Sequence, residues 1–175
     1  MHRYVALLRG INVGGARRIP MKELRGLFGE LGLEDVTSYV ASGNLVFRAA
    51  EAPAAATLQT AIGARFGHAD VPVVVLTAEA FRSVADANPY ADAEPSRAHV
   101  GFLGGSPAIG AREALAALPR GDEELTLGAA ALYLHAPSGM ARTKLTSAAL
   151  ERCLGVPVTL RNLRTVRALY ERCAR

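Results

Sequence analysis

With 175 residues, half of them apolar and about a fifth charged, the chain can bury a core and does not have the composition of a disordered protein. No apolar run approaches the ~20 residues that cross a bilayer, and no signal-peptide pattern opens the chain, so we expect a cytoplasmic protein without a membrane partner. The net charge of +4 is unevenly distributed: residues 1–25 carry +5, residues 142–175 carry +6, and the middle carries −7.

The first half of the sequence predicts the element order βαββαβ. Leu24, Leu27 and Phe28 recur at helical spacing between Pro20, which suits a first helical turn, and Gly32, which suits a helix end. The segment 41–44, Ala-Ser-Gly-Asn, has the chemistry of a hairpin turn. The expected elements are a strand over 4–9, a helix over 21–31, strands over 36–40 and 45–47, a helix over 58–66 and a strand over 71–76.

The second half repeats this order after a linking helix. Thr77 suits the cap of that helix, and Asn88-Pro89 ends it. Ser106 and Pro107 suit the N-cap and first residue of the next helix. The remaining expected elements are strands over 98–103, 124–127 and 131–135, a helix from Thr143 to Gly155, a strand over 156–160 and a C-terminal helix.

The chain thus predicts an α+β fold with two ferredoxin-like βαββαβ halves packed into one globule, plus a linking helix and a C-terminal helix. Right-handed crossovers give each half one antiparallel sheet in the order 4-1-3-2, with both helices on one face. Several strands are apolar at nearly every position, which indicates that the second face is covered too. The expected parts are residues 1–76, a link over 77–97, residues 98–160 and a helix over 161–175.

Two loops of the first half are expected to meet. Strands one and two point the same way, so the end of the first strand lies beside the turn after the second. A phosphate or carboxylate would fit here, because the glycines expose backbone amides next to the N-terminus of the first helix and an arginine. The stretch is neither a P-loop nor a GxGxxG fingerprint, and glycine-rich connections also serve as plain tight turns. The candidate ligand-binding residues are Arg9, Asn12, Gly14, Gly15, Ser42 and Asn44.

A second polar group is expected at one end of the second sheet, where its third and fourth strands end. Lys144 opposes the helix dipole if a helix begins at Thr143, a conflict found at ligand sites, although a solvated surface explains it equally. Asn162 alternatively caps the last helix. The candidate binding residues of this group are Lys144, Arg161 and Asn162.

The motifs point to no metal and no cofactor. His99 and His135 lack a third ligand, and Cys153 and Cys173 form no CxxC or Cys/His cluster, so we expect them to be reduced thiols. The sequence contains no GxSxG, HExxH, paired catalytic carboxylate or Cys/His nucleophile motif, and Ser42 has no evident base near it in sequence. Whether the chain is an enzyme stays open, and no motif indicates an oligomeric state.

Four functional hypotheses therefore stand. The leading one is a binding protein for a phosphorylated or otherwise anionic small molecule. The second is a nucleic-acid-binding protein that uses the basic terminal segments, although solvated helix faces explain this charge equally well and the RNP aromatic signature is absent. The third is an enzyme acting on a phosphorylated substrate, with Lys144 or Arg161 stabilising charge. The fourth is a structural or partner-binding module with no ligand.

The residues quoted above also resemble a known bacterial family, DUF1697. The match rests on the run from Tyr4 to Gly15, on Ser42-Gly43-Asn44, on Asn88-Pro89-Tyr90 and on Thr143-Lys144-Leu145, and it extends over nearly the whole chain. Members usually have Ser where Thr143 stands and a Trp-Asn pair where Leu163-Arg164 stands. The family is of unknown function, so the resemblance implies an α+β fold of this type and supplies no activity.

Overall fold

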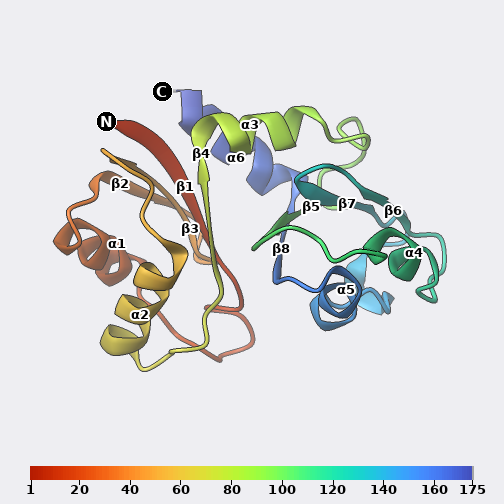
Figure 1. Cartoon of the computed structure of the whole chain (residues 1–175), viewed down its shortest axis with the longest axis horizontal. Helices are drawn as coiled ribbons and strands as arrows, with labels where there is room; N and C mark the ends of the chain where they lie inside the picture. The colour runs from red at the N-terminus through yellow and green to blue at the C-terminus, as the bar shows by residue number, and fades with distance from the viewer. Residues whose placement is uncertain (175) are drawn as a thin grey trace. The chain divides into compact units, whose positions relative to one another are not determined.

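Two four-stranded antiparallel sheets organise the chain, in the orders β2-β3-β1-β4 and β6-β7-β5-β8. Each has the predicted order 4-1-3-2 within its half, and the α+β class with two βαββαβ halves is confirmed (Figure 1). The computed structural model describes residues 1–174, with the backbone alone for Arg142. The chain divides into two units, one formed by residues 1–82 with the segment starting at Ala168, the other by residues 83–167.

Most elements lie within a few residues of their predicted positions, and α3 and α6 each contribute residues to both units. Thr77 caps α3 as expected, because its hydroxyl accepts a hydrogen bond of 3.0 Å from the Ala80 amide. The first half comprises β1 (His2–Leu8), α1 (Met21–Glu30), β2 (Glu34–Tyr39), β3 (Asn44–Ala49), α2 (Ala55–Phe66) and β4 (Val73–Thr77). The rest comprises α3 (Ala78–Asp86), β5 (Ala98–Leu103), α4 (Ala111–Ala116), β6 (Glu124–Leu127), β7 (Ala131–His135), a 3-10 turn (Met140–Arg142), α5 (Ser147–Leu154), β8 (Val158–Asn162) and α6 (Leu163–Ala174).

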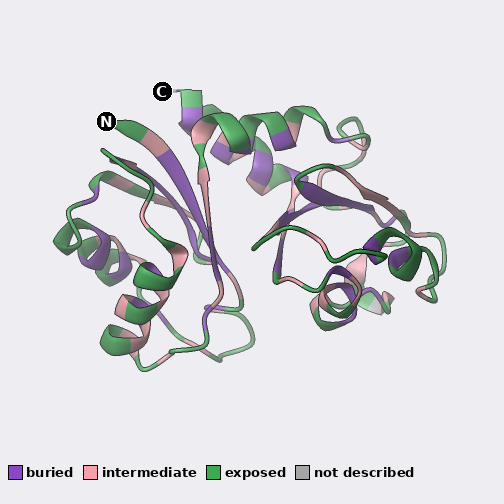
Figure 2. Ribbon diagram, viewed as in Figure 1, coloured by how far each residue is buried: buried purple, intermediate pink, exposed green. Residues whose placement is uncertain are grey.

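The two central strands of the first sheet, β1 and β3, are buried on both faces over most of their length, as the apolar β1 segment predicts (Figure 2). On the helix face, the Phe47 ring stacks on Tyr4 and meets the edge of Phe28 from α1, with ring centroids 5.8 and 5.7 Å away. On the other face, Val5 and Leu7 are fully buried. The end of α6 belongs to this unit and is tied to the start of β1, because Arg3 Nη1 donates to the carbonyl of Arg172 at 2.7 Å.

The second sheet packs α4 and α5 against one face, where leucines of β7 meet those of the helices. The opposite face is partly covered by the linking helix α3, since the Tyr133 hydroxyl of β7 donates to the carbonyl of Val84 at 2.8 Å. Tyr90, from the segment after α3, stacks on His135 with ring centroids 5.4 Å apart. The part of the link from Ser83 onward therefore belongs to the structure of the second unit.

Two predicted helix starts are wrong. Helix α4 begins at Ala111 rather than at Ser106-Pro107, because the Ala108 amide donates to the carbonyl of Leu154 at 2.7 Å and holds this segment against the end of α5. Helix α5 begins at Ser147 rather than at Thr143. Its N-cap is Thr146, whose hydroxyl accepts from the Ala149 amide at 3.2 Å.

Candidate functional site

The end of β1 lies beside the β2–β3 turn, as the topology predicts. The Leu8 amide donates to the carbonyl of Gly43 at 2.8 Å. Gly43 has a φ of +85°, and a Cβ there would stand 2.7 Å from Leu8 Cβ and 3.0 Å from Ile11 Cδ1, so only glycine permits this approach. We call the loop of residues 9–20, the turn of residues 40–43 and the start of α1 the junction site.

Asn12 holds the junction site together. Its side-chain amide nitrogen donates to the carbonyls of Ile19 at 2.9 Å and Ala41 at 2.7 Å, and its side-chain oxygen accepts from the Ile19 amide at 2.9 Å. The backbone of Asn12 is left-handed, with a φ of 55°, a conformation that asparagine tolerates better than most residues. Asn12 is therefore a positioning residue whose polar atoms are already engaged.

Gly14 and Gly15 form the tip of a tight hairpin turn. Their φ values of 61° and 79°, with the Ala16 amide donating to the carbonyl of Val13 at 3.3 Å, are those of a type I′ turn. Both residues are exposed, and neither amide donates a backbone hydrogen bond to another described residue. The glycines therefore make the turn and also leave two amides facing solvent.

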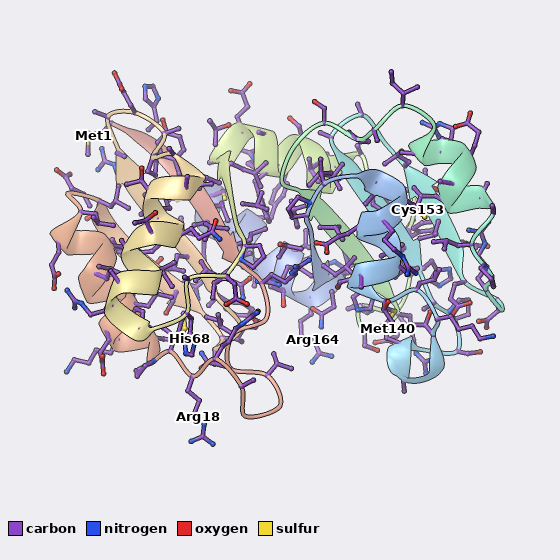
Figure 3. All side chains as sticks on the ribbon, turned by 60° about the horizontal axis from the view of Figure 1, so that its bottom comes forward. Met1, Arg18, His68, Met140, Cys153 and Arg164 are labelled. Atoms are coloured by element: carbon purple, nitrogen blue, oxygen red, sulfur yellow. The ribbon has the colours of Figure 1, made fainter. Side chains whose placement is uncertain are left out.

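An open depression of about 480 Å³ lies at this junction. Asn12, Gly15 and Ala41 line it with Arg18 and the start of α1. Helix α1 has Pro20 as its N-cap and no side-chain cap, so its first-turn amides add partial positive charge at the rim. Figure 3 shows the Arg18 side chain extending outward from the loop, and it makes no hydrogen bond or ion pair with any described residue.

Positive charge concentrates around the junction site. Burial lowers the pKa of Arg9, and the charge of Arg17 lowers it further, although a guanidinium stays protonated at neutral pH. Arg17 forms an ion pair with Asp70 and lies close over Gly10, where a Cβ would stand 3.0 Å from its Nη1. Arg18 follows Arg17 in the loop, so three arginines contribute positive charge around the junction site, which favours an anion.

Backbone strain also gathers here. Within residues 1–174, four non-glycine residues have a left-handed backbone, and three of them, Asn12, Arg17 and Val40, belong to the junction site. Val40 is the most unfavourable of these, because a β-branched side chain at a φ of 49° crowds its own backbone. Residues held in such conformations tend to cluster at ligand-binding sites.

Asn44 and Ser42 shape the turn rather than line the depression. Asn44 is fully buried, and its side-chain amide donates to the carbonyl of Tyr39 at 2.9 Å and to the Ser42 hydroxyl at 3.0 Å. The structure therefore brings the six predicted residues of the first half to one junction, but only Asn12 and Gly15 line the depression. Arg18 was missed by the sequence reasoning. The signal that pointed to it was the adjacent pair Arg17-Arg18 just before the first helix.

Lys144 lies in a separate depression of about 560 Å³, beside Arg120, Asp122 and Glu123. Because α5 begins three residues later, Lys144 does not oppose the dipole of that helix, and the predicted conflict is wrong. The Ser138 hydroxyl donates to Asp122 at 2.6 Å, and hydrogen bonds from Thr143 and the backbone lower the pKa of Glu123. The mixture of acids and bases favours no particular ligand.

Arg161 and Asn162 do not line that depression. Arg161 is 9% exposed on β8, where burial lowers its pKa to about 10. The Asn162 side chain accepts a hydrogen bond of 3.0 Å from the Thr165 amide and so caps α6, as the alternative interpretation of this residue predicts. The structure therefore does not gather Lys144, Arg161 and Asn162 into one pocket.

The two histidines of the second sheet do not form a pair. His99 stands opposite Leu134, and His135 stands opposite Ala98, so the histidine side chains project from opposite faces. Among the residues that the structure describes, no three His, Cys, Asp or Glu side chains gather to hold a metal ion. None of the described helices combines the length and the apolar character that a membrane crossing requires.

Comparisons with known proteins agree with this fold. Residues 1–133 match the model of a protein family described as a protein of unknown function, DUF1697. The chain is also similar to the solved structure of conserved bacterial protein SP0830 from Streptococcus pneumoniae, with 25% sequence identity, a TM-score of 0.70 and 98% of each chain covered. A comparison with curated proteins gave no match.

Proposed function

The chain belongs to the DUF1697 family of proteins of unknown function, and we propose that it binds a phosphorylated or otherwise anionic small molecule at the junction site. One observation carries the proposal: an open depression lies where the glycine turn, the uncapped start of α1 and Arg18 meet. Exposed backbone amides and a helix N-terminus with an arginine suit the charge of a phosphate or a carboxylate.

Each part of the junction site has a role in this proposal. Arg18 supplies the charge, and the Gly15 and first-turn amides of α1 supply donors that do not depend on side chains. Asn12 fixes the loop against Ala41, so the donors are positioned before the ligand arrives. Arg9 and Arg17 add positive potential without lining the depression, which increases the rate at which anions arrive.

Thermal shift with a panel of phosphorylated and carboxylate metabolites, including inorganic phosphate, tests the proposal. We expect at least one compound to raise the melting temperature of the native chain, and Arg18→Gln to weaken its binding by about tenfold. The matched control is Arg65→Gln. Arg65 is an exposed arginine of the same unit that pairs with Glu30, so this substitution removes one positive charge away from the junction site.

Two results would contradict the proposal. One is a panel in which no compound shifts the melting temperature, and the other is equal loss of affinity in Arg18→Gln and Arg65→Gln. Nucleic-acid binding is the competing function, and it is separated by salt, because affinity for a phosphate backbone falls steeply as salt rises. Tight binding of an oligonucleotide with no response to any small anion would favour that competitor.

A further inference from the structure

A second basic pocket lies at the opposite end of β1 from the junction site. It has a volume of about 320 Å³, and its charged lining residues are Arg3, Asp35, Arg48 and Arg172, which we call the arginine pocket. Its lining residues come from β1, β2, β3 and α6, all within the first unit. At ~3.3 Å per strand residue, Arg3 and Arg9 are about 20 Å apart, so the two sites are separate.

The arginine pocket contains a charge conflict. Arg3 of β1 and Arg48 of β3 stand directly opposite each other in the sheet, an arrangement that like charges make unfavourable. Arg172 from α6 adds a third positive charge. Asp35 is the acidic residue that lines the pocket, and Glu34 of β2, which stands opposite Arg48 on the side away from Arg3, is not part of this lining. A conflict of this kind is typical of positions that serve a ligand, because an anion between the guanidinium groups would turn repulsion into attraction.

Neighbouring groups hold the arginines without using most of their donors. Arg3 Nη1 donates to the Arg172 carbonyl at 2.7 Å, which also suits the negative end of α6. The Arg172 guanidinium carbon lies 5.3 Å from the centre of the Tyr39 ring, and this group donates no hydrogen bond to any described residue. A guanidinium has five N–H donors, so the pocket has donors to spare.

Asp35 is a competitor for these donors. Its carboxylate lies 3.3 Å from Arg48 Nη1, and it reaches that position with a left-handed backbone, at a φ of 51°. This ion pair is partly exposed, with the Asp35 side chain 67% accessible, so it is weakly held. An incoming anion can therefore replace the carboxylate on Arg48.

We propose that the arginine pocket binds a phosphate group, as inorganic phosphate or as part of a phosphomonoester. The planar forks of Arg3, Arg48 and Arg172 match phosphate oxygens with paired, charge-assisted hydrogen bonds. The phosphate occupies the space between the three guanidinium groups, and the carboxylate of Asp35 limits its affinity. Nothing in this assignment depends on a ligand at the junction site.

Titration calorimetry with inorganic phosphate, at constant ionic strength in chloride, tests the assignment on the full chain. We expect Arg172→Gln and Arg48→Gln each to weaken phosphate binding by about tenfold. Arg164→Gln is the matched control, because Arg164 is exposed on the same helix, projects outward in Figure 3 and carries the same charge. The control is expected to change the affinity by less than about twofold. Circular dichroism checks that each variant is folded.

Asp35→Asn provides the sharpest measurement. Asparagine tolerates the left-handed backbone, so the turn is kept while the competing charge is removed. We expect phosphate affinity to rise several-fold, whereas a purely structural ion pair predicts no gain. A sugar phosphate titrated beside inorganic phosphate then separates the two sources of the group.

Three results would overturn the assignment: no saturable phosphate binding, equal losses in Arg172→Gln and Arg164→Gln, or unchanged affinity in Asp35→Asn. Binding of a single-stranded oligonucleotide that depends on Arg172 and falls steeply with salt, without phosphate binding, would also overturn it. Arg18→Gln is expected to leave phosphate affinity here unchanged, so failure at one site does not decide the other.

Discussion

The side-chain amide of Asn12 donates to the carbonyl of Ala41 across 2.7 Å, although the two residues are 29 positions apart in sequence. The same side chain bonds twice to the backbone of Ile19, just before α1. One residue thus fixes the loop after β1 against both the β2–β3 turn and the start of the first helix. The shape of the junction site therefore depends on Asn12 before any ligand is present.

Asn12→Ala is expected to lower the free energy of unfolding by about 2–3 kcal/mol, because three hydrogen bonds are lost and alanine resists the left-handed backbone. Urea denaturation measures this. Asn12→Gly separates the two causes, because it loses the hydrogen bonds but accepts the backbone, and we expect it to fall between the native chain and Asn12→Ala. A change below about 0.5 kcal/mol in Asn12→Ala would show that the loop is held by other contacts.

Gly43→Ala is expected to destabilise the chain far more than Gly14→Ala. Both glycines have a positive φ, so both substitutions carry a backbone cost of about 1–2 kcal/mol. At Gly43 the new Cβ also meets Leu8 Cβ at 2.7 Å, whereas at Gly14 nothing lies within 4 Å. Denaturation of the two variants side by side isolates the contact between β1 and the turn, and equal losses would mean that the turn moves away freely.

Most elements were predicted from the sequence because they depend on local chemistry, and the sheet order then followed from the handedness of the crossovers. Alternating and helical apolar patterns, glycine turns and the Thr77 cap all act within a few residues. The false start at Ser106-Pro107 has good cap chemistry, but a hydrogen bond from Ala108 to Leu154 competes with it. That hydrogen bond joins residues that are 46 positions apart, so no local sequence pattern predicts it.

For the candidate sites, too, the sequence predicted one part and missed another. The meeting of the loop after β1 with the β2–β3 turn follows from strand direction alone, which is why the junction was predicted. Which side chains line it depends on rotamers and depth, so buried Asn44 was proposed as a contact and Arg18 was missed. Arg3 faces Arg48 only because of the register between β1 and β3. The hydrophobic pattern restricts this register, but the sequence alone does not show which residues pair across the two strands.

Val40→Asn is expected to stabilise the chain by about 1 kcal/mol. Val40 is 52% exposed and has a φ of 49°, so its side chain contributes little burial while its β-branch strains the backbone. Val13→Asn is the control, because Val13 is 63% exposed and has no left-handed backbone to relieve. A thermal melt of both variants compares them, and a loss of stability in Val40→Asn would show that the valine makes contacts that outweigh its strain.

The stability of the chain is expected to fall with decreasing pH through His99. Burial lowers the pKa of His99 from its ordinary value of 6.5, and its buried Nδ1 has no hydrogen-bond partner. The unfolded chain therefore takes up a proton at a higher pH than the folded chain, so the stabilisation is present above about pH 6.5 and is lost as the pH falls below it.

His99→Leu should flatten the pH dependence of the urea midpoint between about pH 5.5 and 7.5, where carboxylates stay ionised. His2→Gln, at an exposed position, should leave the slope as it is in the native chain. An unchanged slope in His99→Leu would assign the pH dependence to another group.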